Sequence, residues 1–164
     1  MATFGQIASK TRALNINSIL TDIFKTSNLQ KWMIETIQNR LYSKGETGEG
    51  IILKTDKSIN DSYSPVTMDI KSYLGQRTEN VTLKDTGDFY ESFKVVLLLD
   101  GFEITGDFVK GSEHIEDNFN NLFPSKRAFE SSVMSLTDKE INYIVEKKVI
   151  PLLLKEIHEF IRVN

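Results

Sequence analysis

The chain has no cysteine among its 164 residues, and it has only two histidines. The absence of cysteine excludes disulfide bonds and thiolate zinc sites, and it leaves the redox compartment of the protein open. No apolar run approaches the ~20 residues that a membrane-spanning helix needs, so we expect no membrane partner. Residues 1–6 lack the basic and apolar regions of a secretory signal peptide, so the sequence does not favour export by such a signal.

The rest of the composition is typical of a folded domain. Hydrophobic residues make up 40% and charged residues 26% of the chain, and a chain of this length can bury a core as one domain. The net charge of −3 is uneven, because residues 1–44 carry +4 and the remainder carries −7. This excess of basic residues is too small for a nucleic-acid footprint. It could steer a basic end of one subunit toward an acidic face of a neighbour.

Apolar residues at helical spacing predict helices within residues 15–42. Residues 26–28 interrupt the apolar stripes and supply plausible caps, so we expect two helices or one helix with a break. We expect residues 1–42 to form a helical N-terminal arm of a single domain that spans residues 1–164. Residues 65–74 predict a further short helix that starts at Pro65 and ends at Gly75.

The C-terminal segment predicts a helix with a defined start. Thr137 and Glu140 match a capping box, in which the threonine caps the first turn and the glutamate reaches back to the threonine N–H. The apolar residues between positions 141 and 161 then follow helical spacing. Pro151 lacks an N–H and crowds the carbonyl four residues back, so we expect a kink or a restart there.

A β-hairpin is predicted at residues 94–105. Residues 94–99 form a strand-like run, Asp100-Gly101 is a preferred two-residue turn, and residues 102–105 return with alternating polarity. The nearly all-apolar run 95–99 predicts burial on both faces. Because an isolated hairpin is marginal in water, we expect further strands from residues 51–53 and 108–110, or from a neighbouring subunit.

The fold class that follows is α+β. We expect N-terminal helices, a small antiparallel sheet with a central β-hairpin, and a C-terminal helix packed on the sheet. Residues 43–50 predict a flexible turn, and residues 54–64 predict an exposed polar loop. Residues 111–121 predict a solvated acidic loop, in which His114 has acidic neighbours but no second histidine nearby. We therefore predict no metal site and no cofactor.

The triplet Asp85-Thr86-Gly87 supports two hypotheses. It is the active-site triplet of aspartic proteases, in which two loops each supply a carboxylate and the pair shares one proton. A dimeric peptidase is therefore one hypothesis. The flanking charges of Lys84 and Asp88 are wrong for that buried loop, and a second acid would add negative charge beside the dyad.

The second hypothesis makes the same triplet the start of a helix. Asp85 or Thr86 would accept a hydrogen bond from a free N–H of the first turn. Phe89 and Phe93 would then lie on one face of that helix, with Ser92 at its edge. We favour this second hypothesis, in which residues 85–93 form the structural centre of the protomer and subunit contacts lie elsewhere.

Three motifs follow one another in the chain. They are Leu83-x-Asp85-Thr86-Gly87-x-Phe89-x-x-Ser92-Phe93, an upstream Tyr63-Ser64-Pro65-x-Thr67, and a downstream Phe123-Pro124-Ser125-Lys126-Arg127-Ala128-Phe129 with Leu136-Thr137-Asp138-x-Glu140. Their order over about residues 40–160 resembles the virion-morphogenesis, or tail-completion, proteins of tailed bacteriophages. Ser135 stands where that family usually has glycine.

The resemblance implies a non-enzymatic structural protein of the virion. It would be a head–tail connector, neck ring or tail-completion component that joins the portal to the tail. Its partners would be copies of itself in a twelve-fold or six-fold ring, the portal, and other neck and tail proteins, with DNA passing through without sequence-specific binding. The implied location is the virion head–tail junction, and the host cytoplasm during assembly. A generic adaptor that binds partner helices through the N-terminal arm is the remaining alternative.

Overall fold

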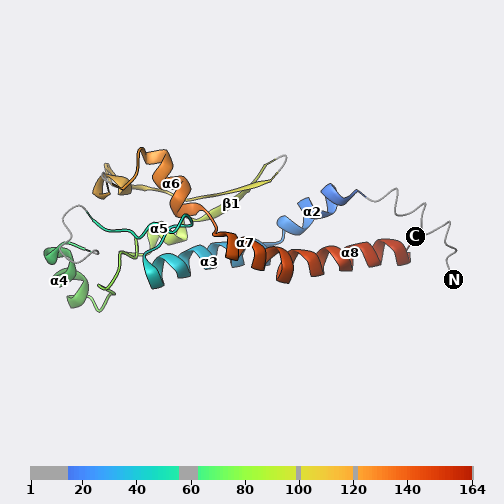
Figure 1. The fold of residues 1–164 in the computed structure, drawn as a ribbon, viewed down its shortest axis with the longest axis horizontal. Coiled ribbons are helices and arrows are strands. Elements are labelled where there is room, and N and C mark those ends of the chain that lie inside the picture. Colours follow the sequence, from blue (N-terminus) through green and yellow to red (C-terminus); the bar gives the residue numbers. More distant parts are fainter. Residues whose placement is uncertain (1–14, 56–62, 99–100, 120–121, 164) are drawn as a thin grey trace. The chain divides into compact units, whose positions relative to one another are not determined.

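The computed structural model describes residues 15–55, 63–98, 101–119 and 122–163 (Figure 1). The fold is α+β, as the sequence predicts, with helices and small antiparallel sheets. The chain divides into two compact units, which are described separately below. Unit 1 contains Met1–Lys31 and Asp138–Asn164, and unit 2 contains Trp32–Thr137.

Unit 1 is helical in its described part. Its elements are α2 (Ile16–Phe24), the start of α3 (Ser27–Lys44), α7 (Asp138–Ile144), the π-helical segment η2 (Val145–Val149) and α8 (Ile150–Val163). Asn15 caps α2, because its side chain accepts a hydrogen bond of 3.1 Å from the Ser18 N–H. The predicted break between the N-terminal helices is confirmed at residues 25–26. Helix α8 contacts α2, while its predicted packing on the sheet stays a prediction.

The sequence predicts a kink or a restart at Pro151, and the structure instead has the π-helical segment η2 directly before α8. The Ile150 N–H donates to the Val145 carbonyl, five residues back, instead of the usual four. A proline ring displaces the carbonyl four residues before it, and a widened turn accommodates that displacement. The helix therefore continues through the proline by changing its hydrogen-bond pattern.

Unit 2 contains the rest of α3 and the remaining elements. They are α4 (Pro65–Tyr73), α5 (Asp88–Glu91), β1 (Lys94–Leu97), β2 (Phe102–Thr105), β3 (Val109–Lys110), β4 (Glu113–His114), the 3₁₀ helix η1 (Ile115–Asn118) and α6 (Lys126–Met134). Met33, Ile37 and Leu41 recur every four residues along α3, and all three are fully buried. These buried residues share one side of α3 and form part of the core of unit 2. Helix α4 is also confirmed, with Ser64 as its N-cap and Gly75 at φ +65° just beyond its end.

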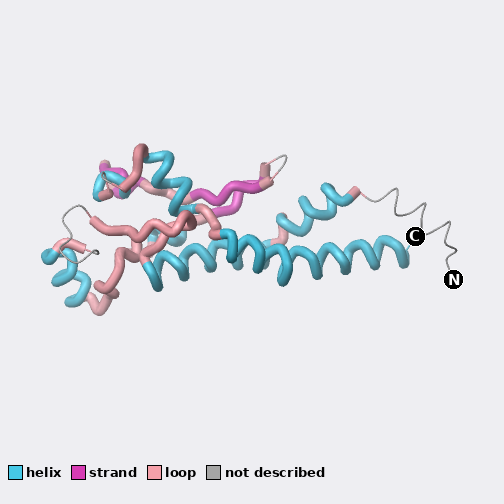
Figure 2. The backbone as a smooth tube through the Cα atoms, viewed as in Figure 1, coloured by secondary structure: helices cyan, strands magenta, loops and turns pink. Residues whose placement is uncertain are grey.

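The predicted hairpin is confirmed in β1 and β2, which pair antiparallel (Figure 2). Its turn differs from the prediction, because Leu97 faces Phe102 and the Leu98 N–H donates to the Gly101 carbonyl at 3.0 Å. Gly101 thus lies opposite Leu98 and is not a central turn residue; Asp100 lies outside the described residues. The prediction of burial on both faces is wrong, because the described strand alternates between exposed and half-buried side chains.

The extra strands predicted for the hairpin form other pairs. Within the described ranges, Val109–Lys110 pairs with Glu113–His114 as a separate small sheet, and Ile52 makes a single bridge with Glu46. The sheet of β1 and β2 therefore has no third strand among the described residues. The predicted exposed loop at residues 54–64 lies mostly outside the described residues. Tyr63, near its end, is described and is buried.

Residues 43–50, which the sequence predicts as a flexible turn, make hydrogen bonds to α3 and to α6. Gly45 N–H caps α3 by donating to the Leu41 carbonyl, and Thr47 is fully buried. The Thr47 hydroxyl is 2.9 Å from that of Ser132 in α6, and the Gly48 N–H donates to the Ser132 carbonyl at 2.9 Å. Gly45 and Gly48 allow a close approach to Val81 and to Ser135, respectively, that a side chain would prevent.

The described part of the predicted acidic loop 111–121 is ordered. His114 is half-buried: it stacks on Phe108 and its Nε2 lies 2.8 Å from a carboxylate oxygen of Glu130. Glu116 and Phe119 are buried. The prediction of a solvated loop is therefore wrong for these residues, which help to close the core around α6. Residues 120–121 lie outside the described residues.

A methyl group at Gly48 tests this close packing. A Cβ there would lie 2.3 Å from the Ser135 backbone oxygen, so Gly48→Ala should lower the free energy of unfolding by about 1–3 kcal/mol. Chemical denaturation of the variant and the wild type measures the difference. Gly101→Ala is the matched control, because its Cβ would meet no atom within 4 Å. Equal stability of both variants would contradict the packing described here.

Candidate functional site

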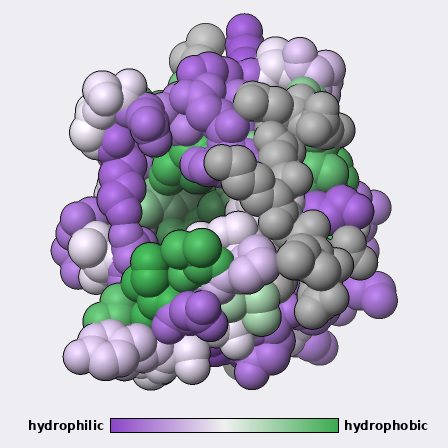
Figure 3. All heavy atoms as spheres, turned by 90° about the vertical axis from the view of Figure 1, so that its left-hand side faces the viewer, coloured by the Kyte–Doolittle hydropathy of each residue, from purple (hydrophilic) through white to green (hydrophobic). Residues whose placement is uncertain are grey.

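A cleft of about 690 Å³ opens on one side of unit 2. Figure 3 shows a hollow on this side, with apolar residues at its base and hydrophilic residues around it. Its walls come from α4, residues 81–89, the β3–β4 hairpin and η1. The volume is in the range of small-molecule and peptide-anchor sites. The cleft is therefore a candidate binding site in unit 2.

The predicted motif residues gather at this cleft. Asp85, Thr86, Gly87, Phe89 and Ser92 line it. Phe93 is buried behind them. The sequence thus identified one wall of the cleft, although it assigned that wall to the core.

The aromatic residues of this wall form a connected cluster. Phe89 packs edge-to-face on Phe93 and on Phe108, with 4.9 Å between ring centroids in both pairs. Phe108 in turn contacts Phe129 of α6, which is fully buried. Edge-to-face pairs at this spacing stabilise a core beyond the area that they bury. The packing of Phe89 and Phe93 agrees with the prediction that residues 85–93 are central to the protomer, whereas Asp85, Thr86 and Asp88 are exposed.

Ser92 links the end of α5 to the chain that follows β2. Its hydroxyl donates to the Phe89 carbonyl at 2.6 Å and accepts from the Asp107 N–H at 2.8 Å. A single side chain therefore satisfies two backbone groups, one of which lies fifteen residues from Ser92 in the sequence. Nothing in the local sequence around Ser92 indicates the second of these contacts.

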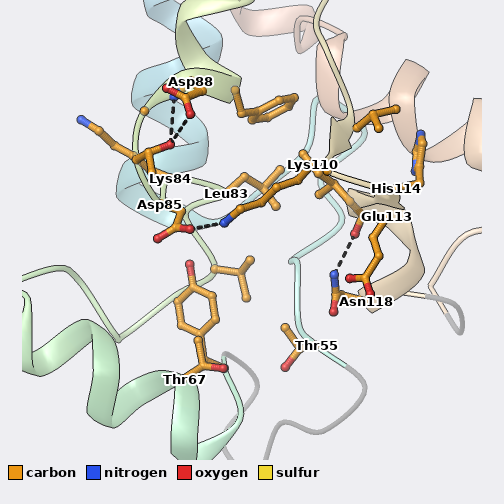
Figure 4. Close-up of a pocket in the computed structure, with 18 of the residues that line it drawn as sticks. Thr55, Thr67, Leu83, Lys84, Asp85, Asp88, Lys110, Glu113, His114 and Asn118 are labelled. Atoms are coloured by element: carbon orange, nitrogen blue, oxygen red, sulfur yellow. Dashed lines mark hydrogen bonds and ion pairs between the residues drawn. The ribbon is translucent and has the colours of Figure 1, made fainter.

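The helix-start hypothesis is right for Thr86 and wrong for Asp85. Helix α5 begins at Asp88 after Gly87 at φ +112°, and the Thr86 hydroxyl accepts a 3.4 Å hydrogen bond from the Asp88 N–H. Asp85 instead forms an ion pair with Lys110 of β3, shown as a dashed line in Figure 4. Lys110 is 25 residues away in sequence, so local pattern could not reveal this partner.

The charge environment of Asp85 is unlike that of a protease dyad. The hydrogen bond from Lys110 lowers the pKa of the Asp85 carboxyl, and the charges of Lys110 and Lys71 act in the same direction. A dyad that shares a proton requires one carboxyl with a raised pKa. The Asp85 side chain is also 56% exposed. These features favour a surface ion pair at this position.

A hydrogen-bond network centred on Thr82 holds the floor of the cleft. The Tyr63 hydroxyl accepts from the Thr82 N–H at 2.8 Å and lies 3.1 Å from the Thr82 hydroxyl. The Tyr90 hydroxyl donates to the Thr82 carbonyl. Burial raises the pKa of both tyrosines. Nothing in the local sequence indicates the role of Thr82, because the surrounding segment has no helical or strand periodicity.

Lys71 is a buried cation beside this network. It is 7% exposed, and its ammonium donates to the Gln76 side chain and to the Lys84 carbonyl, both at 2.9 Å. It also lies 4.9 Å from the centre of the Tyr63 ring. Burial lowers the pKa of Lys71, and the charge of Asp85 opposes that effect. Through these contacts the Lys71 ammonium fixes the loop at residue 84.

Leu83 adopts a left-handed backbone conformation, with φ +52°. This region is strained for a residue with a branched side chain and persists only when the surroundings impose it. Hydrogen bonds hold the backbone on both sides of Leu83, from the Thr82 N–H to Tyr63 and from Lys71 to the Lys84 carbonyl. These bonds impose the conformation of Leu83. Leu83 itself lines the cleft (Figure 4).

The predicted start of the C-terminal helix is confirmed. Helix α7 begins at Asp138, directly after Thr137, and Glu140 lies in its first turn. The reciprocal side-chain bonds of a capping box stay a prediction.

Metal ligands do not gather in the described ranges of the chain, where no group of three or more histidine, aspartate or glutamate side chains could hold an ion. Within the same ranges, no helix combines the length and the apolar character that a membrane span requires. Comparison with known proteins finds no family model, no curated protein and no solved structure that matches this chain.

Removing the Tyr63 hydroxyl tests the Thr82 network. Tyr63→Phe leaves the buried Thr82 N–H without its acceptor, so we expect a loss of about 1–3 kcal/mol in the free energy of unfolding. Urea denaturation of purified protein measures this loss. Tyr73→Phe is the matched control, because Tyr73 is almost fully exposed. A Tyr63→Phe variant as stable as the control would show that the network does not support the fold.

Asp85→Asn separates an ion pair from a catalytic acid. Because the Asp85–Lys110 pair is exposed, we expect a loss of no more than about 1 kcal/mol at neutral pH. Folding lowers the pKa of Asp85 below 3.8, so the wild-type advantage should be full above that pH and disappear as the pH falls through the folded pKa. Denaturation across pH measures it. A pepstatin-sensitive peptidase activity that Asp85→Asn abolishes would support the protease hypothesis instead.

Proposed function

We propose that this chain is a structural, non-enzymatic protein of a tailed-bacteriophage virion. In this proposal it is a head–tail connector, neck ring or tail-completion component at the head–tail junction. Copies of the chain form a ring between the portal and the tail, and DNA passes through its centre. The observation that carries the proposal is the ordered set of motifs that resembles the virion-morphogenesis proteins.

The structural use of the motif residues supports this proposal. In the upstream motif, the Ser64 side chain caps α4 by accepting from the Thr67 N–H, and Tyr63 holds Thr82. In the downstream motif, Ser125 caps α6 by accepting from the Ala128 N–H, and Phe129 is fully buried. Motif residues that cap helices and fill the core are expected in a protein whose function depends on its shape.

Exposed apolar side chains supply a second line of support. Unit 1 alone exposes a set of large apolar residues on α2, α7, η2 and α8: Ile16, Ile141, Tyr143, Val145, Ile150, Leu152 and Leu154. Apolar surface of this extent on a small unit is typical of contacts with other protein chains. A ring requires such surfaces, because each subunit must present two different faces that its neighbours complement.

The two alternatives have less support. The lowered pKa of Asp85 and its ion pair with Lys110 argue against a protease dyad. An adaptor would present its N-terminal helix to a partner, whereas α2 contacts α8 of the same unit. Deletion of residues 1–27 distinguishes the adaptor from the ring. An adaptor would lose its partner, whereas a ring built on the sheet-containing part would keep its self-association.

Particle composition and imaging test the proposal. We expect mass spectrometry to detect this chain in purified particles of the phage that encodes it. We also expect negative-stain images of the purified protein to show closed rings, at low salt and with the portal present. Twelve-fold or six-fold symmetry would identify the ring as matching the portal or the tail. Presence in infected-cell lysate with absence from purified particles would refute the virion assignment.

A further inference from the structure

The side chain of Lys110 reaches across the cleft from β3 to Asp85 (Figure 4). Both side chains of this ion pair are more than half exposed. A lysine ammonium carries three N–H donors, and within the described ranges of the chain Lys110 uses its ammonium for one hydrogen bond, to Asp85. The ammonium of Lys110 therefore lies at the cleft with donors left for a second acceptor.

Apolar side chains line the walls of the same cleft. Ile70 and Leu74 lie one helical turn apart on α4 and its C-terminal end, and Val109 directly precedes Lys110 on β3. Each of the three is more than half exposed. A concave site with apolar walls and a few polar groups is typical of small-molecule pockets, in which the polar groups fix the orientation of the ligand. The walls of this cleft therefore favour a ligand with an apolar body.

The charges beside Asp85 favour a further negative charge. Burial lowers the pKa of Lys71, the charge of Asp85 raises it, and the charge of Lys110 lowers it. These two lysines and Asp85 together carry a net charge of +1, which attracts an anion. Because the Lys71 ammonium already donates to the Gln76 side chain and to a backbone carbonyl, Lys110 is the cation that has donors to spare.

Three further acidic side chains line the cleft, and they are Asp88, Asp107 and Glu113. Asp88 and Asp107 each accept a hydrogen bond from a group two residues away. Glu113 lies on the opposite side of the cleft from Asp85 (Figure 4). A cationic ligand is therefore the competing choice for this cleft.

We propose that the cleft binds a small carboxylic acid with an apolar body, and that Asp85 competes with this ligand for Lys110. The ligand carboxylate accepts hydrogen bonds from the Lys110 ammonium, and its apolar body covers Ile70, Leu74 and Val109. In the free protein, the Asp85 carboxylate holds Lys110 in place of the ligand. An exposed ion pair contributes little to stability, so Lys110 can exchange one carboxylate for the other.

The backbone at Asp85 is held independently of this ion pair. The Gln76 side chain donates to the Asp85 carbonyl at 3.1 Å, and the Lys71 ammonium donates to the Lys84 carbonyl at 2.9 Å. This wall of the cleft therefore keeps its position when the Asp85 carboxylate releases Lys110. The proposed site lies within one protomer, so it does not depend on the virion assignment.

Three ligands with the same alkyl chain test the charge preference: octanoate, octanamide and octylammonium. We expect an NMR titration of the isotope-labelled full chain, at neutral pH and low salt, to give saturable shift changes at residues of the cleft. Octanoate should bind about tenfold more tightly than octanamide, because a hydrogen bond between charged groups adds to the shared apolar contact. Octylammonium should bind more weakly than octanamide.

Two substitutions should change the affinity for octanoate in opposite directions. Lys110→Gln removes the cation, so binding should weaken about tenfold. Asp85→Asn removes the competing carboxylate, so binding should tighten about two- to fivefold. Residues that only support the fold would not give opposite effects. Lys94→Gln is the matched control, because Lys94 is an exposed lysine of β1 outside the described lining of the cleft, and it should leave binding unchanged.

Circular dichroism shows whether each variant keeps the wild-type fold. Equal binding of the three alkyl ligands, preferential binding of octylammonium, or no saturable shift changes at the cleft would overturn the proposal. An unchanged affinity of folded Lys110→Gln for octanoate would also overturn it. N-acetyl-leucyl-leucine carries the carboxylate of a peptide terminus. If this dipeptide bound more tightly than octanoate, the site would belong to a protein terminus and not to a small acid.

Discussion

The buried guanidinium of Arg40 joins three segments on which unit 2 depends. Its Nε donates to the Glu46 carbonyl at 3.1 Å, and its Nη2 donates to the Ser135 carbonyl at 2.7 Å. Arg40 lies on α3, so a single side chain connects this helix to the glycine-containing turn and to the end of α6. A buried cation is costly unless its donors are satisfied, and these two carbonyls accept hydrogen bonds from the Arg40 guanidinium. The charge of Arg40 is therefore buried at the point where the three segments meet.

The same contacts explain why α6 and residues 47–48 pack so closely. The Thr47 and Ser132 hydroxyls meet beside the Arg40 contacts, and Gly48 lies against Ser135 because it has no side chain. The aromatic cluster around Phe129 fills the other side of α6. The helix is thus held by polar groups at one end and by ring packing along its length. The motif residues of this region therefore cap helices and fill the core, and they leave the cleft open on one side of the unit.

Local signals in the sequence predicted the elements well. The helix break before α3, the helix that starts at Pro65, the hairpin strands and the start of α7 all follow from caps, periodicity and turn residues within a few positions. The same signals failed where a distant residue decides the outcome. Asp85 pairs with Lys110, and Thr82 lies under two tyrosines from different segments. An all-apolar run likewise indicated burial of β1, but a strand is buried on both faces only when other elements cover both.

The widened turn at η2 has a consequence for how the C-terminal helix is compared with others. A π-helical turn contains one residue more than an α-helical turn, so it acts as a single-residue insertion inside a continuous helix. The side-chain positions of α8 are rotated relative to those of α7, and a heptad or helical-wheel numbering carried across residues 145–149 assigns the wrong face to every residue beyond them. A related chain without the insertion would need a gap at this point to align its apolar stripe. Such a chain would also lack a proline at the position of Pro151 or carry it elsewhere in the helix.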